Sequence, residues 1–371
     1  MANINEKCNL KDENVCRQEG RLHFIALLRV PAILLVLWAH FGGLWTEQSN
    51  ISWRFKEIIN NDINKPLAIY ENFGFFGVCL FFIISGFIIT YVAQRETVKA
   101  FIIKRVLRIF PALLLSTTIY WIFQKVISSL SGVPNYWSQF SLKDWFLDAT
   151  LLNYFFNKSN AINGVTWSLI VEVLFYTLVA LFFWFIKTKP KIALSLMIYV
   201  CVLNYVVFTK SDLHVNQIAI SISYIPYLIF GQILYYLWSN KITFKWFLFF
   251  NIINYYLVIK NIAFFYPQYY IDKSYGVSLL YAYLIFIVCM LLNDKLKMNR
   301  FTTAVSEMSY SLYINHMPYG FFILSLMYPY VQRQGYTLQF IIAVAVISLV
   351  SYVKYRFIEK TFISLGKKFA K

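Results

Sequence analysis

Long apolar runs alternate with short polar segments along the whole chain. Each run is close to the roughly 20 residues that an α-helix needs to cross the hydrocarbon core of a bilayer. The fifth and seventh runs are the shortest. The ten runs cover residues 24–45, 73–93, 109–131, 164–186, 192–208, 217–238, 246–260, 275–293, 305–329 and 337–357. This pattern predicts an all-α, polytopic integral membrane protein with about ten transmembrane helices.

Composition leads to the same fold class. Hydrophobic residues make up 59% of the 371 positions and aromatic residues 20%, while only 14% are charged. A soluble domain usually carries about 25% charged residues, so a soluble enzyme of this length would have to hide far too much apolar surface. Tryptophan and tyrosine also favour the two interfaces of a bilayer. We expect one helical membrane domain and no separate soluble domain.

The net charge of +17 is explained by where the basic residues lie. If the N-terminus is placed inside the cell, 24 of the Lys and Arg residues fall on the inner side and 10 on the outer side. Cytoplasmic segments of membrane proteins carry such an excess. The charge therefore predicts a multi-pass protein of the cytoplasmic (inner) membrane with both termini in the cytoplasm, and it does not indicate a nucleic-acid partner.

Polar segments flank the apolar region at both ends. Residues 1–23 are polar, and no small-residue cleavage site follows the first run, so that run is expected to be a membrane span rather than a signal peptide. The membrane domain is predicted over 24–360. The basic tail 361–371 can contact anionic membrane lipids. The five cysteines lack the spacing of a metal site, so no metal and no disulfide is expected.

The first run carries two ionisable side chains, whose burial inside a membrane costs free energy. Arg29 and His40 are eleven residues apart, so on an α-helix they share nearly the same face, separated by roughly 16 Å along the axis. Ionisable residues in membrane spans usually face a cavity or a partner and mark a functional site. The spacing therefore predicts a polar stripe that joins the inner and outer ends of this helix.

Glu172 stands out among the seventeen acidic residues because it alone lies well inside a strongly apolar run. Ser168 lies four residues earlier on the same helical face, and Trp167 can help to wall a pocket there. A purely structural alternative is that Glu172 pairs with a basic group to fix helix packing. The functional interpretation is preferred because intramembrane carboxylates generally face a cavity.

Two other groups of residues suggest chemistry in the membrane. His40 and His316 lie within apolar runs, and an imidazole can either move a proton or simply fix helix packing through a hydrogen bond. Arg105 and Arg108 are three residues apart at the inner entrance to the third run, so they share a face. Such a pair can hold phosphates or anchor lipid headgroups, and Pro111 is expected to shape the start of the helix that follows.

Glycine and serine positions in the second run also carry predictions. Gly77 and Gly86 lie among large aromatic and aliphatic residues, and small residues let transmembrane helices approach closely. Ser85 can provide a pocket hydroxyl. No glycine elbow or adjacent base supports Ser85 as a nucleophile.

Six motifs in one order resemble the membrane acyltransferase 3 family of integral-membrane sugar O-acyltransferases. The resemblance covers nearly the whole chain, from about residue 24 to residue 360. The motifs are FIALLRVPAILLVLWAH (24–40), FGVCLFFIISGF (76–87), FIIKRVLRIFP (101–111), WSLIVEVLFY (167–176), SYSLYINHMP (309–318) and YRFIEK (355–360). Val30 and Thr361 depart from the family pattern, but neither change removes a chemical group. The chain is similar to members without an appended extracytoplasmic hydrolase-like domain, so it would modify its acceptor itself or through a separate partner.

This resemblance implies transfer of an acyl group from cytoplasmic acyl-CoA, with acetyl-CoA as the expected donor and co-substrate. The implied acceptor is a hydroxyl of an envelope glycan or glycolipid, such as lipopolysaccharide O-antigen or capsule. The acceptor sugar, the hydroxyl position and the oligomeric state stay open.

The resemblance and the polar residues together suggest a mechanism. Arg105 and Arg108 would hold the CoA phosphates, and Arg29 would guide or polarise the donor arm. His40 would act as general base on the acceptor hydroxyl, or would form an acyl-histidine intermediate. Glu172 would orient His40, as a carboxylate does in a catalytic triad. The remaining predicted pocket residues are Trp167, Ser168, Tyr313 and His316.

Two alternatives from other functional classes remain. Buried Arg, His and Glu side chains also suit a proton-coupled transporter or flippase of a glycan or small solute, although no inverted repeat is evident. A non-catalytic envelope sensor or assembly protein is the other alternative, and the presence of His40 and Glu172 argues against it. A transporter would move its substrate without changing the substrate's mass, whereas a transferase would add an acyl group.

Overall fold

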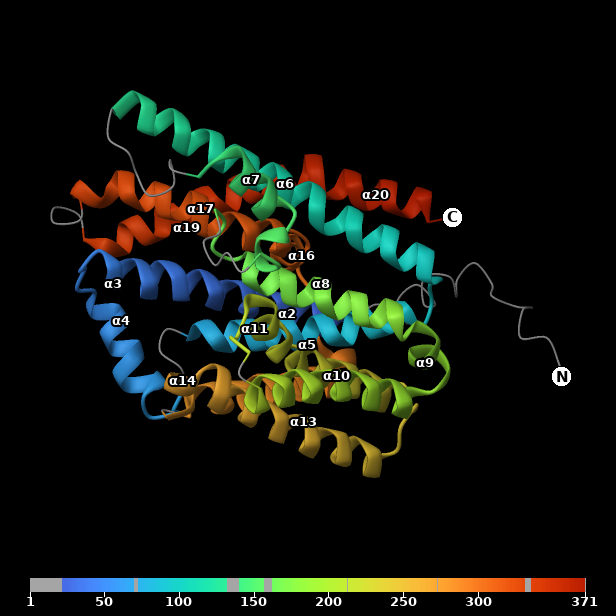
Figure 1. The fold of residues 1–371 in the computed structure, drawn as a ribbon. Coiled ribbons are helices and arrows are strands. Elements are labelled where there is room, and N and C mark those ends of the chain that lie inside the picture. Colours follow the sequence, from blue (N-terminus) through green and yellow to red (C-terminus); the bar gives the residue numbers. More distant parts are fainter. Residues whose placement is uncertain are drawn as a thin grey trace.

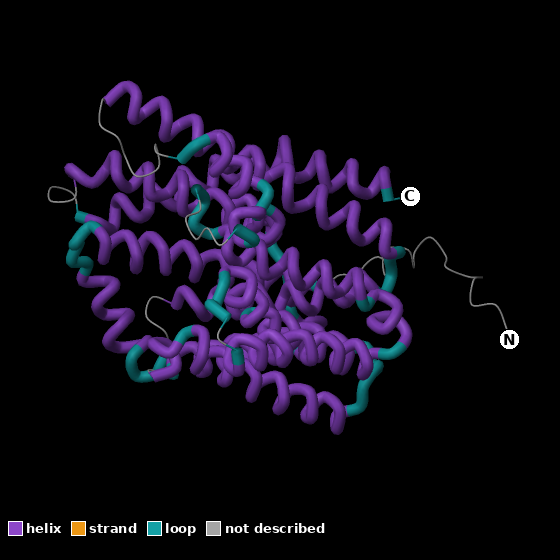
Figure 2. Tube along the Cα trace, viewed as in Figure 1, coloured by secondary structure: helices purple, strands orange, loops and turns teal. Residues whose placement is uncertain are grey.

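A computed structural model describes the chain except for four short internal gaps, two single residues and the two ends. The described ranges are 22–69, 73–131, 140–156, 162–211, 213–271, 273–330 and 335–370. The predicted cytoplasmic segment before residue 22, with Cys8 and Cys16, lies outside them. Every regular element in these ranges is a helix, as Figure 2 shows. The all-α prediction is therefore confirmed.

Each of the ten apolar runs forms helix, and the longer helices run roughly side by side (Figure 1). Within the described residues, eight spans are long and apolar enough to cross a membrane. They are α2–η1–α3 (His23–Gln48), α5 (Gly74–Ala93), α6 from Val98 to Val126, α10 (Pro190–Lys210), α11–α12 (Gln217–Trp238), α13 (Phe244–Phe265), α15 (Ser274–Leu291) and α19–η8–α20 (Tyr336–Phe369).

The other two predicted runs form α8 (Thr166–Leu181) and α17 (Ser309–Met327). Helix α8 has 16 residues, and α17 carries several polar side chains between its apolar ones. Both helices contribute residues to the candidate site described below. The shorter connecting elements are α4 (Arg54–Ile59), η2 (Asn60–Asn64), α7 (Leu142–Ala149), η5 (Leu152–Tyr154), α9 (Phe183–Thr188), α14 (Pro267–Ile271), η6 (Asn293–Lys295), α16 (Arg300–Glu307) and η7 (Tyr328–Tyr330).

Helix boundaries differ from the prediction at three places. The fifth and seventh runs belong to α10 and α13, whose 21 and 22 residues include polar ends that the hydropathy pattern omits. Helix α6 (Val98–Ser131) begins before the basic motif, so Arg105 and Arg108 lie inside a continuous helix. The expectation that Pro111 shapes a helix start was wrong, because Pro111 lies within α6.

Helices α5 and α12 (Ile225–Trp238) form the most tightly packed pair. A Cβ atom added at Gly86 would lie 1.8 Å from the Leu228 carbonyl oxygen, and one added at Gly231 would lie 2.0 Å from that of Ile83. No side chain fits at either position, because the two backbones touch there. The predicted role of Gly86 in close helix packing is confirmed, and Gly77 similarly approaches the Ala32 carbonyl of α2.

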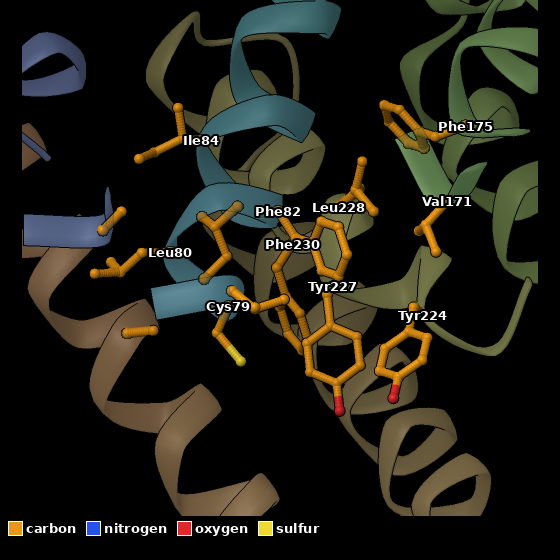
Figure 3. Packing of buried hydrophobic residues seen from close by; sticks show 14 of the residues in the cluster. Cys79, Leu80, Phe82, Ile84, Val171, Phe175, Tyr224, Tyr227, Leu228 and Phe230 are labelled. Atoms are coloured by element: carbon orange, nitrogen blue, oxygen red, sulfur yellow. The ribbon is translucent and has the colours of Figure 1, made fainter. Parts of the chain in front are cut away.

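The apolar core surrounds this pair (Figure 3). Phe82 of α5 faces a cluster that Val171 and Phe175 of α8 approach from one side and Tyr227 of α12 from another. These side chains are all buried. Helix α2 also packs against α5. The core therefore fixes α2, α5 and α8 relative to one another, and these three helices supply much of the candidate site.

Candidate active site

His40 lies where the first membrane helix changes its winding. Helix α2 (His23–Leu37) continues as the π-helix η1 (Trp38–Trp45), an irregularity that often occurs at functional sites. The half-buried His40 ring places Nδ1 2.9 Å from the carbonyl oxygen of Val36. Because a carbonyl can only accept a hydrogen bond, Nδ1 carries a proton.

His316 of α17 is the partner of His40. It is fully buried, and its Nδ1 lies 2.6 Å from the carbonyl oxygen of Tyr313, so this nitrogen also carries a proton. In a neutral ring the other nitrogen is then a hydrogen-bond acceptor. That Nε2 atom lies 3.1 Å from Nδ1 of His40, and the two rings meet at 65° with their centroids 4.7 Å apart.

The two carbonyls therefore define the tautomers of both rings. His40 Nδ1–H is shared between Val36 and His316, which leaves His40 Nε2 as the unprotonated nitrogen of a neutral ring. If Nε2 accepts a proton, the positive charge on the ring is stabilised at Nδ1 by two acceptors. The arrangement has the properties of an oriented general base.

This pairing corrects the expectation that Glu172 orients His40. The hydrogen-bond partners of Glu172 are the hydroxyls of Tyr176, which donates to Oε2 at 3.1 Å, and of Ser85. Ser85 Oγ also lies 3.5 Å from the Tyr176 hydroxyl. Glu172 thus belongs to a second part of the site, and the group beside His40 Nδ1 is the His316 imidazole.

That second part is a cavity between α2, α5, α6, α8 and α17. Its apolar walls include Val78, Phe81 and Ile88. Among the described residues that line it, Glu172 is the one carboxylate. The polar lining consists of Arg29, Ser85, Arg105, Arg108, Ser168, Glu172, Tyr176, Ser309, Tyr310 and Tyr313.

Three guanidinium groups share this cavity. Arg105 and Arg108 come from adjacent turns of α6 and Arg29 from α2, so the structure brings together all three arginines that the sequence singled out. Within the described part of the chain, none of them has a hydrogen bond or an ion pair to a carboxylate, and Arg105 Nε is buried without a partner. Three guanidinium groups that share a cavity with one carboxylate, Glu172, leave an excess of positive charge there, which favours an anionic ligand.

Tyr313 connects the arginine cavity to the histidine pair. Its hydroxyl lies 2.6 Å from Ser168 Oγ, and both residues line the cavity. Its carbonyl accepts from His316, and its ring centroid lies 5.7 Å from the His316 ring. Tyr313 therefore contacts both the cavity lining and the histidine pair.

One predicted pocket residue, Trp167, lies outside the cavity, and one cavity residue, Tyr176, was not predicted. Trp167 does not line the cavity, because its ring packs against Tyr224 and Phe82, 5.1 and 6.2 Å away between centroids. Tyr176 was missed, although its position four residues after Glu172 predicts a contact on the same face. Among the described residues, no three His, Cys, Asp or Glu side chains gather closely enough to hold a metal ion.

The comparisons with known proteins agree with the motifs in the sequence. A family model described as an acyltransferase domain matches residues 22–356. The chain belongs to the acyltransferase 3 family. Nodulation protein 10 of Rhizobium leguminosarum bv. viciae is 31% identical over 171 residues, and the aligned segment covers 42% of this chain and 43% of that relative. The chain thus matches less than half the length of this relative. No solved structure matches the chain.

Proposed function

We propose that this protein is a membrane O-acyltransferase that moves an acyl group from cytoplasmic acyl-CoA to a hydroxyl of a cell-envelope glycan or glycolipid. Acetyl-CoA is the proposed donor, and lipopolysaccharide O-antigen or capsule is the proposed kind of acceptor. The observation that carries the proposal is one arrangement: a cavity with apolar walls holds three arginines, and Tyr313, which lines it, accepts a hydrogen bond from His316 of the histidine pair.

The cavity suits the donor because acyl-CoA combines strong negative charge with a long, mostly uncharged arm. Guanidinium groups bind phosphate in bidentate fashion, so Arg105 and Arg108 would hold CoA phosphates. Arg29 would interact with the arm or polarise its thioester carbonyl. The apolar walls favour the pantetheine and acyl portions, which carry no charge, and exclude the water that would hydrolyse the thioester.

The histidine pair suits the acceptor half of the reaction. His40 Nε2 would take the proton of the acceptor hydroxyl as its oxygen attacks the thioester carbonyl carbon. The tetrahedral intermediate then collapses, the carbon–sulfur bond breaks, and the proton on His40 passes to the departing CoA sulfur. His316 Nε2 would share the Nδ1 proton of the transient imidazolium, which lowers the energy of the charged state.

The proposed orientation places Arg29 at the cytoplasmic end of the first span and His40 toward the outer end. The Lys and Arg bias supports this orientation, with both termini in the cytoplasm of an inner-membrane protein. The proposed catalytic domain comprises residues 24–360. Lys367 and Lys368, at the exposed end of α20 (Lys360–Phe369), would contact anionic lipid headgroups from the same side.

Mass spectrometry of envelope glycans tests the proposal most directly. Cells of the native host would lack the protein, express it, or express His40→Ala at an equal membrane level. An acyl-sized gain in glycan mass that needs both the protein and His40 supports the transferase. An unchanged glycan mass in all three strains, with the natural glycan present, would reject it and favour transport, because a transporter leaves its substrate's mass unchanged.

A further inference from the structure

Helix α17 contains a backbone defect beside His316. Pro318 lies inside this helix and has no N–H group, so it cannot donate to the carbonyl of Ile314, four residues earlier. His316 lies midway between these two residues. A buried carbonyl without a donor is strongly unfavourable inside a protein, and more so within a membrane. Something else must therefore satisfy Ile314.

Asn163 supplies the missing donor. Its side-chain Nδ2 donates to the Ile314 carbonyl oxygen at 2.8 Å, and the residue is 1% exposed. Ser116 Oγ is also near this oxygen, at 3.4 Å, but its shorter bond, of 2.8 Å, is to Asn315 Oδ1. The principal donor to Ile314 thus comes from the segment that connects α7 (Leu142–Ala149) to α8.

Asn163 is itself held on two sides. Its backbone N–H donates to Oδ2 of the buried Asp148 at 3.1 Å, and its carbonyl accepts from Thr166 Oγ1 at 3.0 Å. The next residue, Gly164, lies so close to α17 that an added Cβ would be 2.9 Å from Met317 Cε. The connecting segment therefore contacts α17 on both sides of His316 in sequence.

We propose that Asn163 is a positioning residue for the His40–His316 pair. Its amide replaces the backbone donor that Pro318 removes, and Asp148 holds Asn163 in place from α7. The hydrogen bond fixes the turn of α17 from which the Tyr313 carbonyl orients the His316 ring. The catalytic part of this inference rests on the proposed function, whereas its structural part concerns the histidine pair alone.

The contacts of Asn315, which follows Ile314 in α17, explain why Asn163 matters. Asn315 is already tied to α6 by Ser116 and to α19 by Lys354 Nζ, at 3.0 Å, and by Ser351. Asn163 is the main support on the Ile314 side, toward the outer connection. Without it, the Ile314 carbonyl would turn toward another donor and carry the His316 ring out of alignment with His40.

The test is a mutant cycle between the donor and the proline. Asn163→Ala removes the amide, while Pro318→Ala restores a backbone N–H four residues after Ile314. We expect Asn163→Ala to lower the turnover rate on the order of 10- to 100-fold, with the KM for acyl-CoA nearly unchanged. In the Pro318→Ala background the same substitution should lower the rate by less than about threefold, because the amide is then redundant.

A second readout does not depend on activity. In protein labelled with ¹⁵N-histidine and purified in nanodiscs, the ring nitrogen shifts report the tautomers of His40 and His316. We expect Asn163→Ala to mix the His316 tautomers and Pro318→Ala to restore them. Asn254→Ala is the matched control, since Asn254 is equally buried and donates to the Pro226 carbonyl at the same 2.8 Å, but it joins α13 to α12.

The outcomes separate the two proposals. Altered His316 signals in Asn163→Ala that Pro318→Ala reverses, with unaltered signals in Asn254→Ala, support the positioning role even if the wild-type protein transfers no acyl group. A wild type without transfer activity rejects the proposed function alone. Unchanged ring signals in Asn163→Ala, or a defect of equal size in both proline backgrounds, overturn the positioning role.

Discussion

At the scale of single residues, the candidate base is oriented without a carboxylate. A charged Asp or Glu beside His40 would have to be buried in the membrane at a high cost in free energy. His316 accepts the same Nδ1 hydrogen bond at 3.1 Å as a neutral group. The carbonyls of Val36 and Tyr313 select the tautomers, so backbone geometry does the orienting.

Substitutions of the two histidines should have graded effects. We expect His40→Gln to lower the rate of acyl transfer about 10²- to 10⁴-fold, the usual contribution of a general base. His316→Gln should be milder than His316→Ala, because the amide oxygen of glutamine can still accept from His40 Nδ1. Initial rates of acyl transfer in membranes measure the effects, with His214→Ala in an exposed connection as control. Equal rates for His316→Ala and wild type would contradict the pairing.

The arginines should control donor binding. We expect Arg105→Ala and Arg108→Ala each to raise the KM for acyl-CoA about 10-fold or more, because a charged hydrogen bond contributes about 1.5–3 kcal/mol. Arg→Lys variants should recover only part of the lost affinity for acyl-CoA, since lysine lacks the bidentate fork. Lys99→Ala, an exposed position on the same helix, is the control for charge alone. A lower kcat with an unchanged KM would argue against donor binding.

The sequence identified most of these residues but not their partners. Intramembrane Arg, His and Glu are rare enough to attract attention in a single sequence, and Arg29, Arg105, Arg108 and Glu172 do line one cavity. His40 and His316 are separated by 276 positions, and no pattern in one sequence encodes that contact. Asn163 could not be identified from the sequence either, because an asparagine in a polar connection is usually an ordinary solvated residue.

At the scale of elements, both histidines lie where a helix departs from regular α geometry. His40 lies in the π-helix η1, and His316 lies two residues before Pro318 in α17. Such interruptions free backbone carbonyls, and here the freed groups take side-chain donors. Hydropathy predicted a helix in both places correctly. It could not reveal the π-helical turn. A π-helix has a slightly longer period than the 3.6 residues of an α-helix, and η1 is too short for the two periods to be distinguished.

The contact between α5 and α12 should tolerate no side chain at its centre. We expect Gly86→Ala to separate the two helices and to lower stability by about 3 kcal/mol or more, at the upper end of overpacking effects. Gly366→Ala is the control, because its added Cβ would meet no atom closer than 3.6 Å. Melting temperature in detergent, followed by size-exclusion chromatography, measures the loss. A Gly86→Ala protein as stable as Gly366→Ala would contradict the close packing.

The connection between α7 and α8 should respond to pH. Burial raises the pKa of Asp148 to about 7 from an ordinary value of 3.8, against the opposing effect of the Asn163 N–H. Between those two values the folded chain keeps the proton and the unfolded chain loses it, so the contribution of Asp148 to stability is greatest at and below about pH 4 and falls as pH rises to 7. We expect the melting temperature to fall by at least about 2 °C over this range.

Asp148→Asn supplies the matched comparison. Its amide oxygen can still accept from the Asn163 N–H, but the side chain cannot ionise, so this part of the pH dependence should disappear. Glu57→Gln, at an exposed position on α4, controls for the loss of one charge. A wild-type curve parallel to that of Asp148→Asn between pH 4 and 7 would show that Asp148 keeps an ordinary pKa.

At the scale of the whole molecule, the arginine cavity and the histidine pair lie at different points along the first helix, at Arg29 of α2 and His40 of η1. The tight α5–α12 pair and the helices packed around it hold the arginine cavity, and Tyr313 of α17 contacts both this cavity and His316. The positions of the apolar helices were predictable because lipid imposes a length and a polarity on each span. The order in which the helices surround the cavity was not, since apolar faces of transmembrane helices are chemically alike.

This separation predicts transfer across the membrane. Acyl-CoA cannot cross a bilayer, so in sealed inverted vesicles, whose cytoplasmic face is outside, added acyl-CoA should acylate a glycan enclosed in the lumen. In sealed right-side-out vesicles the same addition should give no product until detergent opens them. Radiolabelled acyl-CoA measures the product, and His40→Ala vesicles set the background. If sealed inverted vesicles also give no product until detergent opens them, donor and acceptor enter from the same face. Arg29 and His40 could not then mark opposite ends of the path, because the acyl group would never have to travel the length of the first helix.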